Sequence, residues 1–95
     1  MKKLDHTPGP WKVVSSGRKY HWPIIEIGKV EVIINTEKHC EANARLIAHA
    51  PDMLDDMIWF VKRCRAGEVR SVKTQARFIE RIESATGKTI EEILK

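Results

Sequence analysis

A change in residue preference near position 37 constrains the fold more than any other feature of this chain. Before it, β-branched residues gather in two short runs, IIEI at 24–27 and VEVII at 30–34. From Glu37 onward such runs disappear, and Ala, Leu, Met, Glu and Arg take over. β-branched residues favour strands, whereas the unbranched residues favour helices. The sequence therefore predicts an α+β fold, with a small antiparallel sheet within residues 11–35 covered by three to four helices within 37–95.

Three strand segments are expected in the first part. Residues 11–14 form the first, followed by a polar turn at 15–19. Residues 20–27 form the second, which Pro23 restricts to an edge or a bent strand because proline cannot donate to the ladder. Gly28 and Lys29 separate the two β-branched runs, which indicates a hairpin.

Four helices are expected in the second part. The first covers about 37–49, with Asn35 and Thr36 offering an N-cap. The second runs from Asp52 to about Arg65, with Pro51 in its first turn. The third covers about 71–85, and the last fills 90–94 behind the S/T-x-x-E spacing of a capping box.

The length and composition limit the class of protein. Ninety-five residues predict one domain, 1–95, with a single core. No apolar run approaches the roughly 20 residues that cross a bilayer, and no signal peptide is expected. Cys40 and Cys64 form no CxxC pair and are expected to be reduced thiols. These features predict a cytoplasmic protein without a membrane partner.

No pattern indicates catalysis or metal binding. The four histidines do not have the spacing of a ligand set, and no nucleophile motif or phosphate loop occurs. Asp52, Asp55 and Asp56 are interpreted as acids that complement a helix N-terminus. The sequence therefore predicts a protein that is not an enzyme and that needs no cofactor or metal.

The opening HTPGPW, residues 6–11, allows two interpretations. Prolines restrict their own φ and the residues before them, so the segment has few conformations in the unfolded chain. It can be a rigid entry that fixes Trp11 in the core. Alternatively, His6, Thr7 and Gly9 line a site. The segment alone does not decide between the two.

The first helix carries two polar residues of interest. At about 100° per residue, Asn43 falls on the face formed by Ala42, Leu46, Ile47 and Ala50, which predicts a buried amide. We expect it to satisfy unpaired backbone, for which the proline-rich segment is one candidate, or to contact a ligand. Arg45 lies off this face and can reach a carboxylate or phosphate.

The second helix combines a core stripe with a tryptophan on the other side. The stripe is apolar at helical spacing and consists of Met53, Leu54, Met57, Ile58, Val61 and Cys64. It is interpreted first as core, with a binding groove as the alternative. Trp59 points to nearly the opposite side. This position predicts an oligomer interface, because aromatic residues are enriched in interfaces, or a second packing layer.

The third helix is predicted to expose a basic stripe of Arg70, Lys73, Arg77 and Arg81. The opposite face would carry Val72, Ala76, Ile79 and Ile82. Between Lys62 and Arg81 the sequence has seven basic residues against two glutamates. Such a stripe can bind phosphates or an acidic protein surface, or it can be a solvated helix face.

Three stretches together resemble one family: HTPGPW, then CEANARLIAHAPDMLDDM at 40–57, and QARFIERIESATG at 75–87. The family is a group of small bacteriophage and prophage proteins that pair an HTPGPW opening with an EANARLIAAAPELLEAL-type helix and a C-terminal helix. This chain departs from that pattern in having His49 where alanine is usual and in being more basic after Lys62. The resemblance implies expression in the cytoplasm of a bacterial host and transfers no activity.

These observations favour a non-catalytic binding protein. The first hypothesis is a counter-defence inhibitor that occupies a host defence protein with an acidic surface, or its nucleotide signal, through Arg45 and the basic stripe. The alternative is a phage accessory protein that binds nucleic acid through the same helix. A homo-oligomer formed through Trp59 would bring two basic helices onto one surface.

Overall fold

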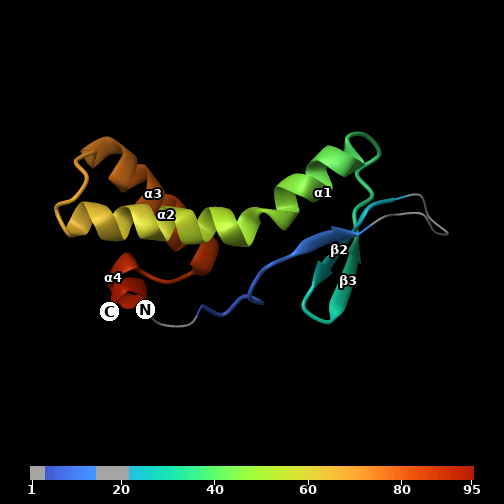
Figure 1. The fold of residues 1–95 in the computed structure, drawn as a ribbon, viewed down its shortest axis with the longest axis horizontal. Helices are drawn as coiled ribbons and strands as arrows, with labels where there is room; N and C mark the ends of the chain where they lie inside the picture. Colours follow the sequence, from blue (N-terminus) through green and yellow to red (C-terminus); the bar gives the residue numbers. More distant parts are fainter. Residues whose placement is uncertain (1–3, 15–21) are drawn as a thin grey trace. The chain divides into compact units, whose positions relative to one another are not determined.

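The computed structural model describes residues 4–14 and 22–95 of the chain. Its elements, in order, are β1 (Lys12–Val14), β2 (Ile24–Ile27), β3 (Val30–Ile33), α1 (Cys40–Ala48), α2 (Ala50–Arg65), α3 (Val72–Thr86) and α4 (Ile90–Leu94). Three antiparallel strands are therefore followed by helices, which confirms the predicted α+β class (Figure 1). The predicted turn at 15–19 lies outside the described residues.

The described residues form two compact units. The sheet unit is Thr7–Asp52, and the helical unit consists of residues 4–6 together with Met53–Lys95. Each unit has its own buried cluster, whereas the chain length predicted a single core. The assignment of one domain, 1–95, stays a prediction. The division does not follow the change in residue preference near position 37, because helix α1 belongs to the sheet unit.

The sheet has the order β1-β2-β3, with Val13 opposite Ile25 and Ile25 opposite Val32. Gly28, with φ 61°, makes the turn of the predicted β2–β3 hairpin. β2 is the central strand, so its assignment to an edge is wrong. It begins only after Pro23, whose carbonyl accepts a hydrogen bond from the Ile34 N–H at 2.9 Å. The missing N–H of the proline therefore falls outside the ladder.

Helix α1 packs on the sheet through small side chains. Ala44 and Ala48 are buried with Ile25 and Ile34, and Trp11 packs against this cluster. The predicted apolar face is wrong, because Leu46 is 62% exposed and Ala42 is exposed as well. Alanines spaced four residues apart lie on one side of a helix and let its backbone approach a neighbouring element closely.

The loop before α1 also differs from the prediction. The helix begins at Cys40 rather than near 37, because Glu37 and His39 have φ values of 62° and 60°, outside the helical region. His39 is the N-cap, and it makes no side-chain cap hydrogen bond. Thr36, the expected cap, instead donates its hydroxyl to the Lys38 carbonyl at 2.9 Å.

Asn43 is half-buried rather than buried, and its amide donates to the Thr36 hydroxyl at 2.8 Å. The expected bond to the proline-rich segment is not the one formed. The Thr36 N–H also lies 3.4 Å from Cys40 Sγ. The Thr36 side chain and backbone thus connect the end of the sheet to the first turn of α1.

The helical unit is built around Ile58, Val61, Ile82, Ile90 and Ile93. Leu4 packs on this core, and Asp5 forms an ion pair with Lys88 at 3.6 Å. Two predicted core faces need correction. Met53 is 50% exposed, and Val72 is 83% exposed. Phe78 packs against the core instead, which rotates the inner face of α3 toward Phe78, Ile79 and Ile82.

The short helix α4 is fixed by polar contacts in its first turn. Thr89 and Glu92 form the predicted capping box, and Glu83 accepts a hydrogen bond from the Ile90 N–H at 2.8 Å. Arg65 of α2 donates to Glu91 of α4 at 3.0 Å. This hydrogen bond lowers the pKa of the exposed Glu91 carboxyl below its ordinary value of 4.5.

The Arg65–Glu91 contact predicts a measurable titration. The pKa of Glu91 is lower in the folded state than in the unfolded state. The ionised carboxylate therefore stabilises the fold at pH values above the unfolded pKa, and this stabilisation is lost as the pH falls through the folded pKa. Carbon-detected NMR titration should find Glu91 below 4.5, and the Arg65→Met variant should raise it. A Glu91 pKa that Arg65→Met leaves unchanged would contradict the contact.

The Thr36 contacts predict a loss of stability when the hydroxyl is removed. Thr36→Val keeps the side-chain shape and should lower the free energy of unfolding by about 0.5–1.5 kcal/mol, because the Asn43 amide and the Lys38 carbonyl lose a partner. Urea unfolding measures the change. Thr74→Val, a matched change in α3, should alter stability by less than about 0.5 kcal/mol. Equal effects of the two variants would refute the role of Thr36.

Candidate binding surfaces

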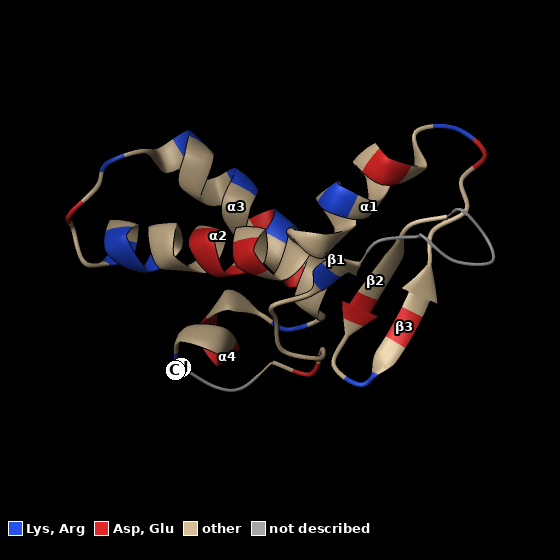
Figure 2. Ribbon diagram, turned by 45° about the vertical axis from the view of Figure 1, so that its right-hand side comes forward, with Lys and Arg blue, Asp and Glu red and all other residues tan. Residues whose placement is uncertain are grey.

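The predicted basic stripe is exposed on the helical unit. Lys73, Arg77 and Arg81 follow one another at four-residue intervals along α3, about 6 Å apart along the helix axis, and Arg70 precedes the helix. All four side chains are exposed. Figure 2 marks the basic positions along α3. We call these four residues the basic row.

The basic row is not neutralised within the part of the chain that the structure describes. There, ion pairs join Arg63 to Glu68, Arg65 to Glu91 and Lys88 to Asp5, and none involves the row. Like charges at i and i+4 destabilise a helix by about 0.2–0.5 kcal/mol per pair. Repulsion within the basic row therefore destabilises α3 slightly, and a negatively charged partner would relieve this repulsion.

Arg45 belongs to a different unit from the basic row. It lies exposed in the last turn of α1, where a cation complements the helix dipole. This position gives Arg45 a local role in α1. Its role as a partner contact stays a prediction.

The HTPGPW segment makes internal contacts in the sheet unit. The Trp11 indole donates to the Thr7 carbonyl at 3.1 Å. A Cβ placed on Gly9 would lie 3.1 Å from Pro51 Cβ, and one placed on Gly28 would lie 3.1 Å from the Thr7 methyl. These close approaches favour the interpretation of the segment as a packing element. A site lined by His6, Thr7 and Gly9 stays a prediction, and His6 itself falls in the helical unit, half-buried.

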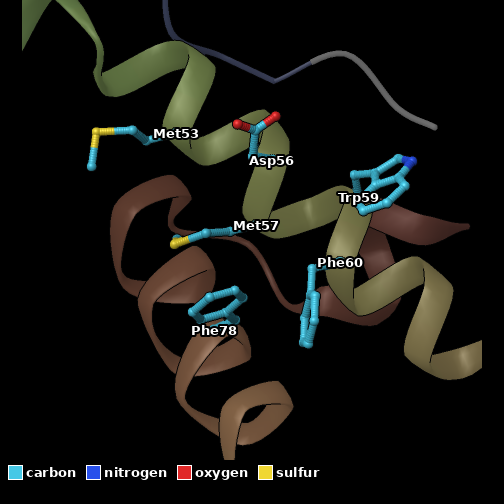
Figure 3. Close-up of a pocket in the computed structure, with 6 residues that line it drawn as sticks. All are labelled: Met53, Asp56, Met57, Trp59, Phe60 and Phe78. Carbon is cyan, nitrogen blue, oxygen red and sulfur yellow. The ribbon is translucent and has the colours of Figure 1, made fainter. Parts of the chain in front are cut away.

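An apolar groove lies in the helical unit, where the sequence favoured a core for the stripe of α2 and had a binding groove as the alternative. It has a volume of about 590 Å³ and is lined by Met53, Asp56, Met57, Trp59, Phe60 and Phe78. In Figure 3 the side chains of Met57, Phe60 and Phe78 lie between α2 and α3, whereas those of Asp56 and Trp59 project from α2 away from Phe60 and Phe78. Phe60 and Phe78 meet edge to face, with ring centroids 5.2 Å apart.

The sequence indicates the helix faces that meet in this groove but not which residues line it. Phe60 and Phe78 each sit at the edge of a core stripe, where a large side chain is only partly covered. Met53 and Met57 were assigned to the core by spacing alone. Spacing identifies the face of a helix but not how far its neighbour covers that face, so the groove appears only when α2 and α3 are placed together.

Trp59 is 56% exposed, as its position opposite the core stripe predicts. The Arg63 guanidinium lies 4.8 Å from its ring centroid, which is a cation–π contact. One face of the indole is therefore covered by its own chain. Its role in an oligomer interface stays a prediction.

Two further features can be stated for the described residues. Within 4–14 and 22–95, no group of three or more His, Cys, Asp or Glu side chains is placed to hold a metal ion. In the same residues, no helix combines the length and the apolar character that crossing a membrane requires.

Comparison with known families identifies the group. A family model described as Salmonella phage P22 protein Y8K6 matches residues 1–92. The chain belongs to this phage protein family. The phage character inferred from the sequence is thereby confirmed, whereas the resemblance of its individual motifs stays a prediction. Comparison with curated proteins and with solved structures gave no match.

Proposed function

We propose that this Y8K6-family protein is a non-catalytic binder that acts in the cytoplasm of the bacterial host. It uses the basic row to occupy an acidic surface of a host protein, and inhibition of a host defence protein is the role that fits a phage-encoded binder of this kind. The observation that carries the proposal is the basic row itself. Its cations are exposed and have no ion-pair partner among the described residues.

The chemistry of the row suits carboxylates. Arg70, Arg77 and Arg81 each offer a planar fork of donors that binds a carboxylate at two points. Charges arranged along one helix also guide an acidic partner to this side and raise the association rate. Both effects weaken as salt is added, because the charges are exposed.

A protein target accounts for the groove better than a nucleotide does. The groove beside α3 is bordered by five apolar or aromatic side chains and by one carboxylate, Asp56. That lining offers a nucleotide phosphate the repulsion of Asp56 and no cationic group to balance its charge. An apolar groove beside a basic row instead resembles a protein-binding surface, which combines an apolar centre with a charged rim.

Nucleic acid remains the second candidate, since the same guanidinium groups bind phosphates. It is distinguished by the salt dependence of binding. The logarithm of the nucleic-acid binding constant falls linearly with the logarithm of the salt concentration, with a slope set by the number of phosphates neutralised. The basic row would give a slope of about three to four.

The proposal predicts that removing charge from the row abolishes capture of the target. The variant Lys73→Gln, Arg77→Gln, Arg81→Gln should lose at least about tenfold in affinity for an acidic protein captured from host lysate, because three charge-assisted contacts disappear. The control variant Lys29→Gln, Lys38→Gln, Lys95→Gln loses the same net charge at exposed positions elsewhere and should bind like the wild type.

Titration of the purified partner by calorimetry measures both affinities. Equal losses in the two variants would show a general charge effect and would refute the row as the binding surface. Retention of DNA or RNA in place of a protein, with the salt slope described above, would replace the proposal by the second candidate.

A further inference from the structure

We propose that a second copy of this chain packs on the side of α2 that carries Trp59, with the two α2 helices antiparallel across a two-fold axis and each Trp59 placed beside the Asp56 of the other. The inference concerns α2 and does not depend on what the basic row binds. It commits to self-association because the charges of α2 are complementary to themselves.

The first observation is uncovered apolar surface in one place. Trp59 is 56% exposed, and in Figure 3 its indole projects from α2 away from Phe60 and Phe78. An exposed apolar patch rimmed by charged residues marks an interaction surface in soluble proteins. Tryptophan in particular contributes a large share of the binding energy in interfaces.

The second observation is the order of residues along one side of α2. At 100° per residue, Asp52, Asp56, Trp59 and Arg63 fall within a sector of about 60°, away from the buried Ile58 and Val61. We call these four residues the α2 stripe. All four are exposed.

The α2 stripe is complementary to a second copy of itself that runs in the opposite direction. Asp52 and Asp56 lie toward the start of the helix, whereas Trp59 and Arg63 lie toward its end. Figure 2 shows the same separation of acidic and basic positions along α2. An antiparallel pair centred between Asp56 and Trp59 sets Asp52 opposite Arg63 of the second copy, and Asp56 opposite its Trp59.

A parallel arrangement does not have this property. It would set the acidic half of one helix against the acidic half of the other, and the basic half against the basic half. The remaining charges of α2 follow the same order, since Asp55 is in the acidic half and Lys62 is in the basic half. Charge therefore selects the antiparallel pair.

The existing contacts of Arg63 are compatible with a second partner. Arg63 pairs with Glu68 and lies over the Trp59 ring within its own chain. A guanidinium has five N–H donors, so it can serve Glu68 and the Asp52 of a second copy at once. The contact with the indole also holds the Trp59 ring in one position before association.

The experiment is sedimentation equilibrium of the full-length chain between about 1 and 100 µM at low salt. The wild type should form a dimer. Trp59→Glu should raise the dimer dissociation constant at least tenfold, with an unchanged circular dichroism spectrum. Leu46→Glu, the same kind of change at an exposed apolar position of α1, should leave the constant unchanged.

A charge exchange tests the antiparallel pairing itself. Asp52→Arg and Arg63→Asp should each weaken the dimer, because each sets like charges opposite one another. The double variant carrying both changes should recover most of the lost affinity. A wild type that stays monomeric up to 100 µM, a dimer that Trp59→Glu does not weaken, or a double variant weaker than either single one would each overturn the proposal.

Discussion

The close packing of the N-terminal segment against helix α1 and the start of α2 is the constraint on which the sheet unit depends. A three-stranded sheet with strands of three or four residues has little interior of its own. Trp11 adds a large side chain to the cluster of Ile25, Ala44 and Ala48, and Gly9 lies against Pro51. The HTPGPW segment and the ANARLIAHAP stretch are therefore two halves of one packing arrangement.

This arrangement explains which parts of the fold the sequence predicts. The type and order of the elements follow from local preference, and α4 was predicted to the residue because its capping box is a local signal. The start of α1 was wrong because Glu37 and His39 adopt left-handed conformations that no residue type there requires. The buried face of α1 was wrong because close packing on the sheet selects small alanines over the larger Leu46.

The candidate binding surfaces also include features that the sequence predicts and features that it does not. Exposure of the basic row and of Trp59 could be predicted, because charge and position on an amphipathic helix indicate the solvent side. The lining and depth of the groove could not, because they arise where Met57 and Phe60 of α2 meet Phe78 of α3. Sequence spacing gives the face of each helix, whereas the depth of a groove depends on how two faces fit together.

The two proposals place recognition on helices α2 and α3. The basic row lies on α3 and the α2 stripe on the helix beside it, whereas the HTPGPW segment packs within the sheet unit. Two copies joined through α2 would carry two basic rows, and a target with an extended acidic surface would then bind more tightly than one row allows. A partner that covers these surfaces would account both for the exposed cations of the basic row and for the exposed indole of Trp59.

The central claim is that the N-terminal segment is a packing element, and a double-mutant cycle between Gly9 and Pro51 tests it most directly. Gly9→Ala should lower the free energy of unfolding by about 1 kcal/mol, because the added methyl meets the buried Pro51 ring. In the Pro51→Ala background the same change should cost less, which gives a coupling energy of at least about 0.5 kcal/mol. The account would be contradicted if Gly9→Ala left the free energy of unfolding at its wild-type value and if the effects of the Gly9 and Pro51 substitutions were additive.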